Sequence, residues 1–112
     1  MQEVLRIDGL PANALDAAAA FHANWLGKAR SLLDGGADSL VLVMAPAAHD
    51  HADWRRAAVR DLARAHAPKR VNLLASDDET AIAAALDYLA HAPGLTGQFL
   101  PLDGHGAGNP AG

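Results

Sequence analysis

Short apolar runs alternate along this chain with longer stretches in which apolar residues recur every three or four positions. Short runs of this kind are typical of strands, and the three-to-four spacing is typical of helices. The pattern predicts strands at residues 4–7, 39–44, 70–74 and 98–102, separated by helices at 13–33, about 50–66 and 77–92. Because strands that alternate with helices through short links form parallel sheets, we predict an α/β fold with strand order 1-2-3-4.

The ends of these elements carry local signals. The side-chain oxygen of Asn13 can accept a hydrogen bond from a free N–H group of the first helix, and the pair Gly35-Gly36 ends that helix. Ser76 and Glu79, three residues apart, form a predicted capping box before the last helix. Pro101 lacks a backbone N–H, so the last strand is predicted at an edge of the sheet.

The helix near residues 50–66 is predicted to have one apolar and one charged face. We expect its arginines, Arg55 and Arg56 among them, to stay largely in solvent. The predicted inner stripe consists of Trp54, Ala57, Ala58, Leu62 and Ala65.

Composition narrows the class of protein. A chain of 112 residues has room for one domain, which we place at 1–103, followed by a flexible Gly-rich tail at 104–112. The absence of cysteine excludes disulfides and thiolate chemistry. A formal net charge of −4 argues against nucleic acid or an anionic membrane as a partner.

Nothing in the pattern predicts export or membrane insertion. The longest apolar run, 40–48, is much shorter than the roughly 20 residues needed to cross a bilayer. The first residues lack the basic and apolar regions of a signal peptide. We therefore expect a cytoplasmic protein with no membrane partner.

Four segments together resemble the second half of a short-chain dehydrogenase/reductase (SDR), from that family's fourth strand to its seventh. The family's Asp-Val-Leu-Val-Asn-Asn-Ala-Gly segment resembles Glu3–Gly9, and its Asn-x-x-Gly resembles Asn24–Gly27. Its fifth helix and sixth strand resemble Ala57–Ala63 and Arg70–Asn72, and its Thr-Gly-Gln…Asp-Gly-Gly ending resembles Leu95–Gly104. The resemblance implies half of a Rossmann-like doubly wound fold.

Departures from the family's pattern bear on activity. Relatives in this family bind a dinucleotide through a Gly-rich turn after their first strand, and that part is absent here. The family's catalytic serine position matches Ala45, and its Tyr-x-x-x-Lys positions match Ala52 and Arg56. Asn24 alone matches a catalytic position, as a vestige. The resemblance therefore implies a chain without cofactor or catalytic residues.

Polar side chains also gather at the predicted carboxyl ends of the strands, where open parallel sheets bind ligands. They are Asp8, His49, His51, Ser76, Asp103 and His105. Imidazole and carboxylate suit zinc and other divalent ions, so this edge is a candidate metal site. Geometry weakens that hypothesis because strands two and four lie about 10 Å apart.

We therefore predict a non-catalytic SDR-like module that acts by oligomerisation or as a silent subunit of a full-length dehydrogenase. The resemblance implies contacts through helices 13–33 and 50–66 and through residues 77–102. One alternative is a small-molecule or metal-dependent enzyme that uses His49, His51, Asp103 and His105. Others are an SDR-type oxidoreductase completed by a partner chain, and a gene fragment without a role.

Overall fold

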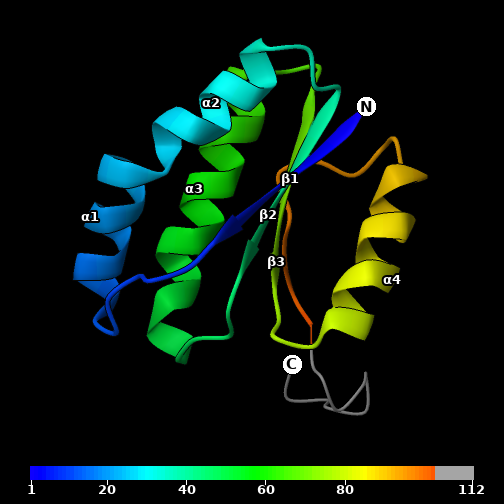
Figure 1. Ribbon diagram of the computed structural model, residues 1–112. Helices are drawn as coiled ribbons and strands as arrows, with labels where there is room; N and C mark the ends of the chain where they lie inside the picture. Colours follow the sequence, from blue (N-terminus) through cyan, green and yellow to red (C-terminus); the bar gives the residue numbers. More distant parts are fainter. Residues whose placement is uncertain (103–112) are drawn as a thin grey trace.

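A four-stranded parallel sheet, with helices on both faces, forms the part of the chain that the computed structural model describes, residues 1–102 (Figure 1). The elements are β1 (Gln2–Ile7), α1 (Ala14–Asn24), α2 (Leu26–Asp34), β2 (Ser39–Met44), the single 3-10 turn η1 (His49–His51), α3 (Ala52–Ala65), β3 (Arg70–Ala75), α4 (Glu79–Ala90) and β4 (Phe99–Pro101). The strand order is β1-β2-β3-β4, as predicted, and every pair is parallel.

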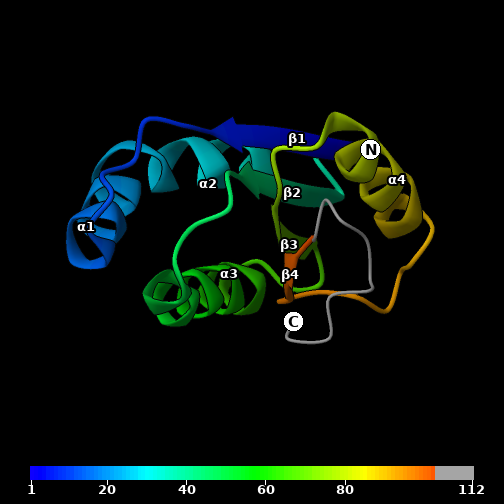
Figure 2. The ribbon, with the colours of Figure 1, turned by 90° about the horizontal axis from the view of Figure 1, so that it is seen from below.

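Two layers of helices cover the sheet. Figures 1 and 2 show α1, α2 and α3 on one face and α4 alone on the other. All six residues of β2 are buried, which confirms the central strand predicted from its apolar run. Alternate residues of β2 therefore serve two cores: Leu40, Leu42 and Met44 face the three-helix layer, and Val41 and Val43 face α4.

The stretch predicted as one helix at 13–33 is two helices, α1 and α2, joined at Trp25. Trp25 has φ −119° and ψ −28°, far enough from helical values to bend the chain. Hydrogen bonds continue through the bend, since the Trp25 N–H donates to Phe21 and the Ala29 N–H donates to Trp25. Asn24 and Gly27, both weak helix formers, flank the bend and supply its local cause. The predicted ends are confirmed: Asn13 caps α1 and Gly35 ends α2.

The buried face of α3 differs in part from the predicted one, since Ala58 and Leu62 are buried as predicted but the other members of the stripe are not. Ala57 and Ala65 are exposed, whereas Arg55, Val59 and Ala63 are buried. The helix is thus rotated so that residues at positions 55, 59, 62 and 63 face the sheet. Trp54 biased the predicted face because its ring packs beside the stripe, against Phe21, and stays half-buried.

The last helix begins differently from its predicted capping box. Asp78 is the N-cap of α4, and its carboxylate accepts hydrogen bonds from the N–H groups of Thr80 and Ala81. Ser76 instead accepts the N–H of Asp78, and Glu79 pairs with Arg6 on β1 at 3.0 Å. Asp78 is the residue directly before the helix, so its carboxylate reaches the N–H groups of the first turn, whereas Ser76 lies two residues earlier and reaches only the N–H of Asp78.

β4 lies at the sheet edge, which confirms the position predicted from Pro101. Within residues 1–102, no helix combines the length and apolar character that crossing a membrane requires. The predicted tail, 104–112, lies outside the described residues.

Candidate functional site

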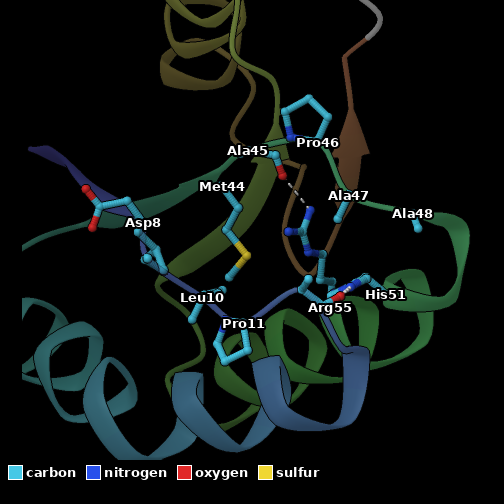
Figure 3. Close-up of a pocket in the computed structure, with 13 residues that line it drawn as sticks. Asp8, Leu10, Pro11, Met44, Ala45, Pro46, Ala47, Ala48, His51 and Arg55 are labelled. Carbon is cyan, nitrogen blue, oxygen red and sulfur yellow. Dashed lines mark hydrogen bonds between the residues drawn. The ribbon is translucent and has the colours of Figure 1, made fainter.

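A cavity of about 420 Å³ opens at the carboxyl ends of β1 and β2 (Figure 3). Its walls come from the β1–α1 loop, residues 8–12, from the β2–η1 loop, residues 45–48, and from Arg55 of α3. Gly9 has φ +71°, a conformation that favours glycine and that turns the chain shortly after the end of β1. The volume falls within the range of pockets that hold small molecules.

The structure brings only part of the predicted strand-end group to this cavity. Asp8 and His51 line it, whereas His49 lines a neighbouring cavity of about 310 Å³. Ser76 lines neither cavity and is buried beneath the start of α4. Asn24 is exposed at the end of α1 and lines neither cavity. Asp103 and His105 lie outside the described residues.

The metal hypothesis gains no support from these positions. Among residues 1–102, no three His, Asp or Glu side chains are grouped so that they could hold a metal ion. His51, which this hypothesis counted as a ligand, already uses both ring nitrogens. Nε2 lies 2.8 Å from the carbonyl oxygen of Ala12, and Nδ1 accepts the indole N–H of Trp54 at 3.1 Å. These contacts assign Nδ1 as the acceptor and Nε2 as the donor, so His51 ties the β1–α1 loop to α3.

Replacing His51 with alanine is expected to lower the free energy of unfolding by about 1–3 kcal/mol, because a buried side chain and its two hydrogen bonds are lost. Chemical denaturation measures the difference. His49→Ala is the matched control because His49 is exposed, and its effect is expected within about 0.5 kcal/mol. If both variants lower the free energy of unfolding equally, the two hydrogen bonds of His51 contribute little to stability.

Arg55 is the site residue that the sequence interpretation missed, since it was expected in solvent. Its side chain is 4% exposed, and Nη1 donates to the carbonyl oxygen of Ala45 at 3.0 Å. Nε is buried without a hydrogen-bond partner, and Arg55 forms no ion pair with any described carboxylate. The guanidinium lies 5.7 Å from the ring centre of Trp54. Burial lowers the pKa of Arg55 because it takes the charged group out of water.

The smaller cavity lies on the other side of the same loop. Arg55 lines both cavities, and the loop segment 46–48 separates them. Arg56 lines only the smaller cavity and lies 5.6 Å from the ring centre of Phe99. The two cavities therefore share one buried cation, and the larger one is otherwise walled mainly by apolar groups.

Three of the four positions matched to catalytic residues in the sequence line these cavities, and Asn24 does not. Ala45 lines the larger cavity, and Ala52 and Arg56 line the smaller one. These positions lie near the carboxyl ends of the parallel strands, and open parallel sheets bind ligands beyond those ends. At Ala45 and Ala52, however, the chain presents methyl groups.

Comparison with known proteins found one match. The model of a family described as short chain dehydrogenase-like protein matches residues 5–102. No curated protein and no solved structure matches the chain.

Proposed function

Because the chain belongs to the SDR-like family of short chain dehydrogenase-like proteins, we propose that it is a catalytically silent member that acts by association. The proposed partner is a second copy of the chain, bound along the free edge of β1. The observation that carries the proposal is the methyl group at Ala45 and at Ala52, where the resemblance places the family's catalytic hydroxyl groups.

A methyl group neither donates nor accepts a proton, and hydride transfer to a carbonyl needs a proton donor beside it. Arg55 does not replace that donor, because a guanidinium keeps its proton in proteins. Its Nη1 atom is moreover engaged with the Ala45 carbonyl oxygen. The cavity thus has a group suited to binding and lacks the acid that the family's chemistry would use.

β1 supports the association part of the proposal. Within the described residues, this strand pairs only with β2, so its outer backbone groups are available to another strand. Two contacts with α4 hold it in place: the amide of Gln2 donates to Leu86, and Arg6 pairs with Glu79. Val4, at the middle of the strand, is 36% exposed. β1 is therefore an ordered strand with an open side.

Antiparallel pairing of two β1 strands extends the sheet across a two-fold axis. Centred on Val4, such a pairing sets Val4 against Val4, Glu3 against Leu5 and Gln2 against Arg6. No two like charges then face each other, and like charges directly opposite are what destabilises strand pairs. Pairing two identical edges in this way closes the assembly at a dimer.

The alternative contact, through the outer side of α1 and α3, has less support. The exposed side of α3 carries Arg60, Asp61 and Arg64, and charged residues are depleted in the cores of stable interfaces. On α1, Leu15 is the one large apolar side chain that is strongly exposed, at 80%. A full-length dehydrogenase that offers a strand edge is a second possible partner for the same side of β1.

Val4→Lys is expected to convert the dimer to a monomer, because it places two ammonium groups against each other at the centre of the pairing. Light scattering on eluted protein measures the change from twice 11.6 kDa to 11.6 kDa. Leu15→Lys adds the same charge on α1 and is expected to leave the mass unchanged. Dissociation by Leu15→Lys alone would move the interface to the helices and overturn the proposal for β1.

Two further results would overturn the proposal. One is a wild-type chain that remains monomeric at micromolar concentration. The other is hydride transfer by the purified chain with NADH or NADPH and a set of aldehydes and ketones, which would show that catalysis has been rebuilt on other residues.

A further inference from the structure

The cavity between the ends of β1 and β2 combines a buried cation with mainly apolar walls, and the inference about its ligand is independent of the proposed association. We infer that this cavity binds the carboxylate of a small, largely apolar organic acid, with Arg55 as the group that recognises the charge. The ligand class follows from the one buried cation, from the walls around it and from the position of Asp8.

Among residues 1–102, Arg55 has no carboxylate partner of the kind that a buried charge normally has. Buried charged side chains are nearly always paired, because leaving water costs more than a single neutral hydrogen bond returns. Here a side chain 4% exposed makes one hydrogen bond, to a backbone carbonyl, and its Nε makes none. The nearby ring of Trp54 offsets only part of the cost. An anion in the cavity supplies the missing partner.

The nearest acidic group in the cavity does not fill that role. Asp8 lines the cavity, but it forms no ion pair with Arg55. Figure 3 shows its carboxylate pointing away from the guanidinium, which points instead toward Ala45. The cation thus faces the interior while the acid lies at the rim.

The remaining walls fit an apolar body. They are formed mainly by Ile7, Leu10, Pro11, Met44, Pro46 and Ala48. His51 is the third polar side chain of the lining, and both of its ring nitrogens are already bonded. A mostly hydrophobic pocket with one well-placed charge is the common pattern of sites for small organic ligands.

A carboxylate fits this arrangement better than a phosphate group. One guanidinium offers a planar pair of N–H groups that matches the two oxygens of a carboxylate. Phosphate carries more charge and more acceptor oxygens than a single arginine satisfies, and Asp8 at the rim repels a dianion. The inference therefore names monocarboxylic acids with a short aliphatic or aromatic body.

The test is a titration of the ¹⁵N-labelled chain with hexanoate, followed through backbone amide shifts. Hexanoate is expected to shift the amides of Gly9, Leu10 and Ala47, which surround the cavity. Hexanamide, which has the same body without the charge, and inorganic phosphate are expected to bind at least tenfold more weakly. Arg55→Met is expected to weaken hexanoate binding at least tenfold, since it removes the cation and keeps the bulk of the side chain.

Substitutions at Ala45 and Ala52 locate the site while Arg55 itself is kept. Ala45→Leu narrows the larger cavity alone, and Ala52→Leu narrows the smaller one alone. Ala45→Leu is expected to reduce hexanoate binding at least tenfold, and Ala52→Leu is expected to leave it unchanged.

Several results would overturn the inference. These are no saturable shift with hexanoate, equal binding of hexanoate and hexanamide, preference for phosphate, or loss of binding in Ala52→Leu instead of Ala45→Leu. If Arg55→Met fails to fold, the comparison of the two alanine variants still decides the outcome. An unchanged oligomer mass with bound hexanoate would separate this result from the test of β1 pairing.

Discussion

Phe21→Ala is expected to destabilise the protein by about 3–5 kcal/mol, which is a large share of the 5–15 kcal/mol that typically holds a domain of this size together. Phe21 is fully buried in the core between α1, α3 and the sheet. Its ring lies 5.7 Å from that of Trp54, whose indole N–H in turn holds His51. Truncation therefore leaves a cavity in the core beside Trp54. Urea denaturation followed by circular dichroism measures the loss.

Tyr88→Ala is the matched control for this variant. It removes an aromatic ring of nearly the same size from α4, where Tyr88 is 62% exposed. Its effect is expected within about 0.5 kcal/mol. If Phe21→Ala lowers the free energy of unfolding by less than about 1 kcal/mol, the core collapses around the missing ring, and packing of Phe21 contributes less to stability than expected.

Arg55→Met is expected to have the opposite sign and to stabilise the ligand-free protein by about 1 kcal/mol. Replacing buried ionic groups with apolar side chains of similar volume is often neutral or stabilising, because the cost of removing the charge from water disappears. The lost hydrogen bond to Ala45 offsets only part of this gain, since Ala45 is exposed and its carbonyl can bind water. For a domain of this size the change corresponds to a rise of roughly 4 °C in Tm.

Arg56→Met serves as the control, because Arg56 is the exposed neighbour of Arg55 on the same helix. Its Tm is expected to stay near that of the wild type. A clear fall in Tm for Arg55→Met would show that the guanidinium is a structural clamp on the β2–η1 loop, and a stabilised variant with weakened hexanoate binding would mark it as a group retained for a ligand.

Local patterns in the sequence predicted the fold well, because strand and helix periods are short-range properties. The apolar run at 39–44 predicted a strand buried on both faces, and Asn13 predicted the start of α1. The bend at Trp25 was missed because apolar spacing continues through it. Its local cause is Asn24 and Gly27, two weak helix formers that flank Trp25.

The candidate site was predicted less well, because it depends on contacts between distant segments. Carboxyl ends of strands were predicted to carry the site, and Asp8 and His51 do line the cavity. The contacts of His51 were not predicted, since its bond to Ala12 connects segments 39 positions apart and leaves no visible pattern in the sequence. Arg55 was missed because a charged residue is normally exposed. Its spacing was the available signal, since Val59 and Leu62 of the buried stripe follow Arg55 at four and seven positions.

The strand order has a consequence for how the chain folds as it is synthesised. Each strand pairs with the strand made just before it, so β1, the helices that follow it and β2 form a complete unit before β3 is made. Every later strand then adds to an edge that already exists. Strand pairing can thus follow the direction of translation, whereas the face of β2 that carries Val41 and Val43 stays uncovered until α4 is made.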